Sequence, residues 1–328
     1  MDFDSIIGQT EVISALKNSI SSDRVGHAYI FTGPKGIGKR TVARAFSSML
    51  LCENCKDNGN CNECLCCRLF KDGTNPDFCI IEPEGASIKI EEIRVIQSDI
   101  IVKPLYSKRK VYIISEADLM TTQAQNCLLK VLEEPPGYAV IILTTTNSNS
   151  LLETIRSRAI KVNFKKNTLD EVKSYLISKI GRNDSSIDFI STYADGIIGA
   201  AAQLSDSEEF ISIREKTIDL VIKIASGAKL TGILEHVDFF ESNRNNIDII
   251  LDIMLLIYRD MLLLKKTGNE KILINSDKKD IILKNLPNLT TEKLLVNMEV
   301  IEATRREIKQ NANYQLSIEV MLIKLQEE

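Results

Sequence analysis

A glycine-rich run, Gly33-Pro34-Lys35-Gly36-Ile37-Gly38-Lys39, follows an apolar β-type segment directly and opens a helical pattern. A strand, a glycine-rich loop and a helix in this order are typical of a phosphate-binding loop. The glycines let backbone N–H groups converge on phosphate oxygens at the helix N-terminus, and the last lysine reaches the outer phosphates. We expect this loop to be formed mainly by Gly33, Gly36, Gly38 and Lys39.

The first half of the chain alternates β-rich runs with helical patterns, which predicts a parallel sheet flanked by helices. Strands are expected over 28–32, 78–82, 111–115, 139–145 and 160–164. A helix is expected over 122–132, with Thr122 and Gln125 as its capping box and two prolines after its end. Beyond residue 164 the pattern is helical throughout.

These patterns divide the chain into three parts. We expect an α/β phosphate-loop domain over 1–165, a small helical lid domain over 166–207 and an all-α domain over 208–328. A length of 328 residues is ample for two or three domains. The stretch 246–266 is strongly apolar, and a helix of this kind is normally buried against neighbouring helices or a partner.

Two positions depart from what a hydrolytic phosphate loop needs. Arg40 follows the loop lysine, where a Ser or Thr hydroxyl would bind Mg²⁺. The strand expected at 111–115 ends in Ser115 and Glu116, where an acidic pair would order Mg²⁺ and polarise the attacking water. We therefore expect no ATP hydrolysis at this site. Whether the loop still binds ATP stays open at this point.

Cys52, Cys61, Cys64 and Cys67 have the spacing C-x8-C-x2-C-x2-C. Two-residue gaps let thiolates turn back on one ion, and four thiolates make a closed tetrahedral Zn²⁺ site. We expect a structural zinc insert over 52–67. Buried free thiols and a redox C-x-x-C motif are the alternatives, and Cys55 or Cys66 could replace one ligand.

Charge and composition limit the possible partners. The formal net charge is −4, whereas a protein that holds DNA unaided usually shows a basic excess. We therefore expect protein partners first, and DNA contact only as a shared task. The one basic cluster, Lys103, Lys108, Arg109 and Lys110, is interpreted as a solvated turn.

Neither a secretory signal nor a membrane span is expected, so we predict a cytoplasmic protein whose cysteines form no disulfide framework.

Several strings in the chain, taken together, resemble the clamp-loader AAA+ family. They are residues 3–9, residues 27–31, the phosphate loop, the four-cysteine insert, the run 126–136 (NCLLKVLEEPP) and Ser157-Arg158-Ala159. The resemblance covers about 1–205. It implies a pentameric complex of DNA polymerase III that loads the sliding clamp onto primed DNA, with ATP sites between subunits. The implied partners are gamma/tau-type motor subunits and a delta subunit, with the clamp and primer–template DNA contacted through the assembled complex. The all-α domain 208–328 would be the oligomerisation collar.

The resemblance also assigns roles to single residues. Arg158 stands in the Ser-Arg-Cys motif, with Ala159 in place of Cys, and would act in trans as an arginine finger at a neighbour's ATP. Motor subunits carry an arginine in the lid motif where this chain has Gly199. The resemblance therefore implies a subunit that is no enzyme by itself and assists a neighbour's site. Without the family resemblance, Arg158 would be interpreted as an ordinary surface arginine.

Two alternatives stay open at this point. One is an active gamma/tau-type ATPase subunit of the same loader, which an ATPase assay would reveal. The other is a zinc-module nucleic-acid-binding protein with a decayed ATPase fold. Its DNA affinity would fall steeply with salt, because phosphate contacts release counterions.

Overall fold

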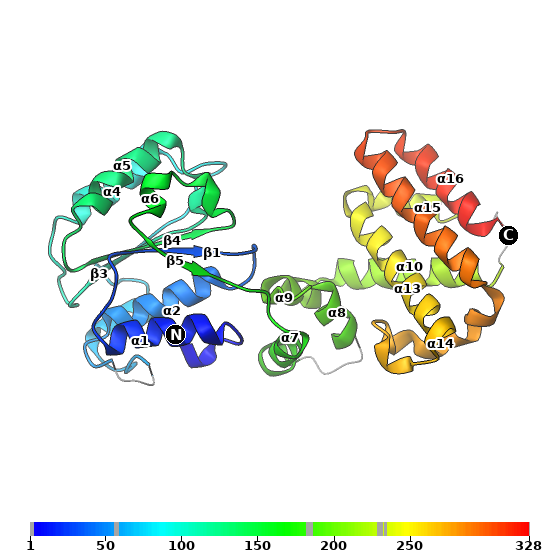
Figure 1. Ribbon diagram of the computed structural model, residues 1–328, viewed down its shortest axis with the longest axis horizontal. Helices are drawn as coiled ribbons and strands as arrows, with labels where there is room; N and C mark the ends of the chain where they lie inside the picture. Colours follow the sequence, from blue (N-terminus) through cyan, green and yellow to red (C-terminus); the bar gives the residue numbers. More distant parts are fainter. Residues whose placement is uncertain (1–2, 56–58, 182–185, 228–231, 233–234, 328) are drawn as a thin grey trace. The chain divides into compact units, whose positions relative to one another are not determined.

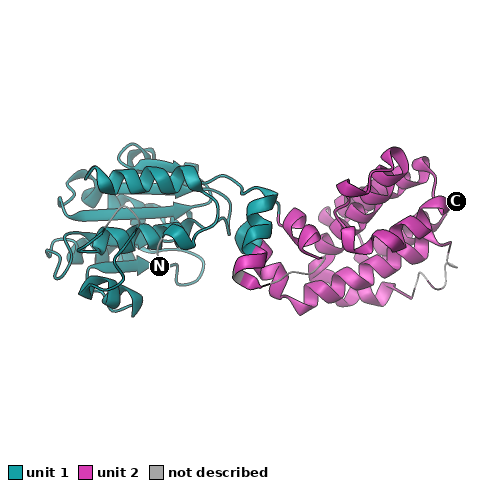
Figure 2. Ribbon diagram, turned by 90° about the horizontal axis from the view of Figure 1, so that it is seen from below, with its two compact units in different colours: residues 1–175, 195–200 teal, residues 176–194, 201–328 magenta. Residues whose placement is uncertain are grey.

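The computed structural model describes residues 3–55, 59–181, 186–227, 232 and 235–327. These residues form two compact units, one of 1–175 with 195–200 and the other of 176–194 with 201–328 (Figure 2). The region expected as a lid, 166–207, is shared between the two units. The three-part division therefore stays a prediction. Parts of the expected insert (56–58), lid (182–185) and C-terminal domain (228–231, 233–234, 328) lie outside the described residues.

The first unit is built on a parallel five-stranded sheet in the order β2-β3-β4-β1-β5. The strands are β1 (Ala28–Thr32), β2 (Phe78–Ile81), β3 (Lys110–Ile114), β4 (Ala139–Thr145) and β5 (Ile160–Asn163). The five predicted strands are confirmed, with ends displaced by one residue at most. Every residue of β3 and β4 is buried, as expected for central strands covered on both faces.

Helices cover both faces of this sheet (Figure 1). One face packs against α1 (Thr10–Ser21) and α2 (Lys39–Leu51), and the other against α4 (Ile90–Asp99), α5 (Thr122–Glu133) and α6 (Glu153–Arg156). Alternate strand residues serve the two cores: Ile141 packs on the α4/α5 side, while Val140 and Ile142 pack on the α2 side. The short helices α3 (Leu65–Lys71) and α7 (Leu169–Tyr175) complete the unit.

The start of α5 corrects one prediction. Its N-cap is Thr121, whose hydroxyl oxygen accepts from the amide of Ala124 at 3.2 Å. Thr122 is the first helical residue. Gln125 makes no capping box: its side chain is buried, and its Oε1 accepts from the amide of Leu152 at 2.8 Å. The side chain of Gln125 thus binds a residue that is distant in sequence, and does not cap the N-terminus of α5 as the local pattern predicted.

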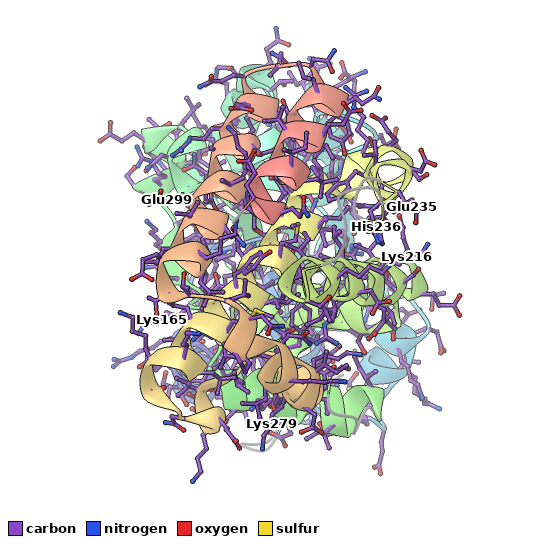
Figure 3. The ribbon with its side chains drawn as sticks, turned by 90° about the vertical axis from the view of Figure 1, so that its right-hand side faces the viewer. Lys165, Lys216, Glu235, His236, Lys279 and Glu299 are labelled. Carbon is purple, nitrogen blue, oxygen red and sulfur yellow. The ribbon has the colours of Figure 1, made fainter. Side chains whose placement is uncertain are left out.

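The second unit is helical. Its elements are the π-helical turn Leu176–Ile180, α8 (Ile187–Tyr193), most of α9 (Ile198–Asp206), α10 (Glu208–Ala225), α12 (Val237–Ser242), α13 (Ile247–Thr267), α14 (Lys279–Asn285), α15 (Thr291–Lys309) and α16 (Tyr314–Gln326). The buried apolar helix predicted at 246–266 is α13, which packs against α10 and α15. Charged side chains, among them Lys279 and Glu299, cover the outside of this unit (Figure 3). Among the described helices, none has both the length and the apolar character needed to cross a membrane.

A buried ionic cluster fixes the loop before α14 to the core of the second unit. Arg214 of α10 pairs with Asp277 through both terminal nitrogens, at 2.7 and 2.8 Å, and donates to Asn275 at 3.0 Å. Its guanidinium also lies 4.1 Å from the ring centre of Phe189. Both charged side chains are more than nine-tenths buried, so each depends on the other for compensation.

Candidate functional site

The predicted phosphate loop lies between β1 and α2, at the carboxyl edge of the sheet. Gly36 and Gly38 have φ angles of 79° and 102°, in the left-handed region that glycine adopts without a Cβ penalty. The loop borders a hollow of about 310 Å³ that is also lined by Ser115, Glu116, Gly199 and residues 144–146. This volume is at the lower end of the range for small-molecule sites.

Lys39 is buried inside its own loop. Its Nζ donates to the carbonyl oxygens of Gly33 at 2.7 Å and Pro34 at 2.8 Å. Burial lowers the pKa of Lys39 below its usual value, while the carboxylates of Asp118 and Glu116 oppose this effect. A phosphate group would have to draw the ammonium away from these two carbonyl oxygens.

The two positions that depart from a hydrolytic loop lie at the same hollow. Arg40 forms an ion pair with Glu82, the residue after β2. Ser115 is 5% exposed, and its hydroxyl has no hydrogen-bond partner within the described part of the chain. Glu116 lies 3.9 Å from Nζ of Lys35. At these positions the hollow therefore has a guanidinium group where a hydroxyl would bind Mg²⁺, and a neutral hydroxyl where a carboxylate would do so.

The end of β4 borders the hollow through hydroxyl groups. Thr144 accepts through Oγ1 from the amide of Glu116 at 3.2 Å. Thr146 donates through Oγ1 to Asp118 at 2.7 Å. Sequence reasoning missed Asp118, although a carboxylate two residues after Glu116, beyond a buried strand, was a usable signal.

Gly199 lies against the phosphate loop. Its amide donates to the carbonyl oxygen of Gly36 at 2.9 Å. A Cβ at this position would lie 2.7 Å from that oxygen, closer than real Cβ atoms come. The sequence singled out Gly199 for a missing arginine, but did not reveal that this conformation leaves no room for any side chain there.

The four predicted cysteine ligands come together at the end of α2. Their sulfur atoms all lie within 4.8 Å of one another. The Cys52–Cys61 and Cys61–Cys67 sulfur distances are 3.6 and 3.9 Å. Sulfurs held 2.3 Å from one tetrahedral ion lie about 3.8 Å apart, so this donor set fits Zn²⁺.

Backbone amides support the same cluster. The amides of Cys61, Cys64 and Cys67 donate to the sulfurs of Cys52, Cys61 and Cys64, at 3.3, 3.3 and 3.4 Å. Backbone donors lower the pKa of Cys61 to about 6, whereas burial raises that of Cys52 to about 11 and also raises that of Cys67. A bound divalent cation would supply the charge needed to ionise the buried thiols.

The two candidate substitute ligands point elsewhere. Cys55 Sγ lies 3.7 Å from the carbonyl oxygen of Gly59. Cys66 is fully buried, and its Sγ lies 3.4 Å from the carbonyl oxygen of Tyr106. Neither belongs to the group of close cysteines found among the described residues.

Arg158 lies just after α6 and is partly exposed. Its Nη1 donates to the carbonyl oxygen of Thr154 at 3.1 Å, and its Nη2 lies 3.2 Å from Oε1 of Glu133. The guanidinium group is thus held in one orientation by two elements of the same unit. It remains accessible, with 37% of its side chain exposed.

A parallel sheet with this strand order, helices on both faces and a phosphate loop after β1 defines an AAA+ P-loop domain. The predicted fold class, with its cysteine cluster and helical C-terminal region, is confirmed. Residues 8–168 match the family model described as "DNA polymerase III, delta subunit", and residues 208–327 match "DNA polymerase III, delta subunit, C terminal". The chain belongs to the delta-prime family of DNA polymerase III clamp-loader subunits.

The chain is similar to several individual proteins. The chain is 32% identical over 325 residues to DNA polymerase III subunit delta' of Bacillus subtilis, covering 97% of this chain and 96% of the relative. It is 28% identical over 346 residues to the tau subunit of the same organism, of which it spans 61%. A solved structure, a gamma subunit-related protein of Thermotoga maritima, aligns with a TM-score of 0.43 at 20% identity, covering 95% of this chain and 98% of that one.

Proposed function

We propose that this chain is a non-hydrolysing subunit of the clamp loader and supplies Arg158 to the ATP site of a neighbouring motor subunit. The assembled complex would load the sliding clamp onto primed DNA. Membership of the delta-prime family supports a place for this chain in the clamp-loader complex. The role of Arg158 rests on its motif and on its accessible, oriented guanidinium group.

The observation that carries the proposal is the composition of the hollow at the phosphate loop. Arg40 is turned to Glu82, and Ser115 contributes only a hydroxyl. The third position, Gly199, has no side chain and no space for one. Phosphoryl transfer depends on metal ions and positioned cations around the phosphates. A site without its usual Mg²⁺ ligands and lid arginine would not sustain turnover.

Arg158 is suited to act outside its own unit. A guanidinium group keeps its charge and offers a planar fork of donors that matches phosphate oxygens. A neighbour's γ-phosphate would compete with Glu133 for this fork, and both partners of that ion pair are partly exposed. Exposed pairs of this kind contribute about 0–1 kcal/mol, so exchanging partners would cost little.

The remaining assignments complete the proposal. A structural Zn²⁺ would be held by the cysteines at 52, 61, 64 and 67.

Residues 208–328 would form the oligomerisation collar. In support, a hollow of about 810 Å³ beside α13 and α15 is lined by Leu255, Leu295 and Val296, and the last two are nearly half exposed. Partners would be motor and delta subunits, and clamp and DNA through the complex. The chain would act in the cytoplasm, as the sequence predicts.

An active gamma/tau-type subunit is the second candidate, favoured by the match to a tau subunit. The three departures at the phosphate-loop hollow argue against it. A zinc-module nucleic-acid-binding protein is less well supported, because the net charge is −4.

The decisive experiment measures ATP turnover of the purified chain and of a loader rebuilt from purified subunits. We expect no turnover from the chain alone. In the loader, Arg158→Ala should slow hydrolysis and impair clamp loading, while Lys39→Ala should have much less effect. If Lys39→Ala proves as damaging as Arg158→Ala with assembly intact, the chain is a working ATPase and the proposal is wrong.

A further inference from the structure

A buried hydroxyl group at the phosphate-loop hollow has no partner among the described residues. It belongs to Ser115, which is 5% exposed and lines the hollow. The amide of Ser115 donates to the carbonyl oxygen of Ile81 at 2.9 Å, and this bond fixes the backbone just beyond the end of β3. A buried polar atom without a partner costs free energy unless a ligand or water satisfies it. The hollow is therefore suited to a ligand that binds this hydroxyl.

The N-terminus of α2 offers amide groups at the same hollow. The first helical hydrogen bond runs from the amide of Val42 to the carbonyl oxygen of Gly38 at 3.0 Å. The three preceding amides, of residues 39–41, have no helical partner, and the N-cap Gly38 has no side chain to bond them. All three of these residues line the hollow. Amides at a helix N-terminus attract anions, because the helix dipole places partial positive charge there.

The side chains around the hollow carry more positive than negative charge. Lys35, Lys39 and Arg40 line it, against the carboxylate of Glu116. Glu116 lies 3.9 Å from Nζ of Lys35, which offsets its charge. Arg40 pairs with Glu82, and both side chains are about half exposed, so this pair is weak and can exchange for an anion in the hollow. An anion that enters the hollow therefore meets a net positive charge.

The lining also limits the size and kind of ligand. The hollow is bordered by Lys, Arg, Glu, Ser, Thr and Gly residues, and no apolar or aromatic residue lines it in the part of the chain that the structure describes. A purine base would need such a surface, because small-molecule sites are built mainly from apolar and aromatic side chains. The volume of about 310 Å³ is also small for a site of this kind. These features favour a small oxyanion over a whole nucleotide.

The two departures from a hydrolytic loop favour a phosphate group without a metal. A carboxylate at position 115 would repel a bare phosphate and would need Mg²⁺ between the two negative groups. The hydroxyl of Ser115 is neutral and can donate to a phosphate oxygen. Arg40 places a fixed positive charge where a hydroxyl would have bound the metal. The changes that remove the metal ligands thus also remove the need for the metal.

We propose that this hollow is a metal-independent site for a bare phosphate group, with inorganic phosphate as its ligand. The hydroxyl of Ser115 and the amides of residues 39–41 donate to the phosphate oxygens. Arg40 supplies the positive charge that Mg²⁺ supplies in a hydrolytic site. The inference rests on the proposed function in one respect, the absence of ATP turnover at this hollow, and it does not involve Arg158.

The test is isothermal titration calorimetry of the full chain with inorganic phosphate, at an ionic strength held constant with chloride. We expect saturable binding with the same affinity in Mg²⁺ and in a chelator. Ser115→Asp should weaken binding by about tenfold or more, because it places a carboxylate against the phosphate. Ser115→Asn, with a neutral side chain of the same size as Asp, should stay within about threefold of wild type. Ser98→Asp, at an exposed serine of α4, is the matched control for the added charge and should bind phosphate like wild type.

A second series distinguishes free phosphate from nucleotide. Adenosine should not bind. ATP without Mg²⁺ should bind no more tightly than tripolyphosphate, which carries the same number of phosphates and no base. An affinity for ATP that is about tenfold higher than for tripolyphosphate would show that the base is recognised, and would overturn the inference.

Three further results would also overturn it: no phosphate binding by wild type, loss of binding in chelator, or equal binding by wild type and Ser115→Asp. Circular dichroism checks that each variant folds. If Ser115→Asp does not fold, Arg40→Gln takes its place and should lower phosphate affinity by about fivefold, and an unchanged affinity would count against the site. ATP turnover is measured on the same protein. Turnover with Mg²⁺ would refute the proposed function, whereas a chain with neither turnover nor phosphate binding would refute only this inference.

Discussion

Arg158 and Glu133 form an ion pair between two elements of the first unit, with Nη2 of Arg158 lying 3.2 Å from Oε1 of Glu133. Glu133 is the last residue of α5, and Arg158 follows α6. Because both side chains are partly exposed, the pair contributes little to folding stability. Its effect is to orient the guanidinium group.

Glu133→Gln should therefore act on the neighbour's ATP site and leave folding unchanged. We expect hydrolysis by the rebuilt loader to rise by up to about fivefold, because the variant removes a competing ion pair of about 1 kcal/mol. Arg158→Lys should instead slow hydrolysis, because an ammonium group lacks the planar fork. The measurement is kcat of the complex. Equal rates for wild type and Arg158→Lys would show that the planar guanidinium group of Arg158 does not bind the neighbour's phosphate.

The cysteine cluster should contain one zinc ion per chain, measured by elemental analysis of protein purified without chelators. Cys61→Ser should lose the metal and destabilise the insert, whereas Cys79→Ser, outside the cluster, should retain it. Affinity should fall as the pH falls, because binding requires thiolates and protons compete with the ion. Metal-free protein with a normally folded insert would contradict this prediction.

Removing the metal should also loosen the segment between α4 and β3. The amides of Leu105, Tyr106 and Ser107 are bonded to Asp77, and Ser107 contacts Cys66. After chelation we expect faster hydrogen exchange at these three amides. The central strand β4 serves as the internal reference and should stay protected. Unchanged exchange at these three amides would mean that the cysteine insert does not support this segment.

Restoring metal ligands at the hollow should restore metal-dependent binding without full activity. Arg40→Thr with Ser115→Asp would supply a hydroxyl and a carboxylate for Mg²⁺. We expect Mg²⁺-dependent affinity for a fluorescent ATP analogue to increase at least tenfold over wild type. Turnover should remain at background, because Gly199 still provides no arginine. Rapid hydrolysis by the double variant would show that the two metal ligands were the only defect.

The buried cluster around Arg214 should be important for the stability of the second unit. Arg214→Ala leaves Asp277 buried without its partner, and breaking such a pair costs about 3–5 kcal/mol. Lys278→Ala removes a more exposed pair with Glu215 and should cost about 1 kcal/mol or less. Urea unfolding followed by circular dichroism would measure both. Similar losses in the free energy of unfolding for the two variants would indicate that burial does not strengthen the Arg214–Asp277 pair.

Local patterns predicted the strands, the phosphate loop and the cysteine cluster, because each depends on residues close in sequence. The N-cap of α5 was wrong by one residue. Two adjacent threonines suit that position equally well, and Gln125 is taken by a contact with Leu152, 27 residues away. The anchoring of the segment between α4 and β3 was missed for a similar reason. Asp77 anchors amides 28–30 residues further along the chain, and no periodicity in the sequence reveals that pairing.

The contact between Gly199 and Gly36 has an evolutionary consequence. Main-chain atoms of the two residues meet at 2.9 Å, so a side chain at position 199 fits only after the phosphate loop has moved. An arginine there, as the resemblance ascribes to motor subunits, would need a second change in the loop at the same time. Mutations arrive one at a time, and an intermediate with a clash is selected against. The closed phosphate loop and the glycine at position 199 thus depend on each other, and a change at one position requires a change at the other.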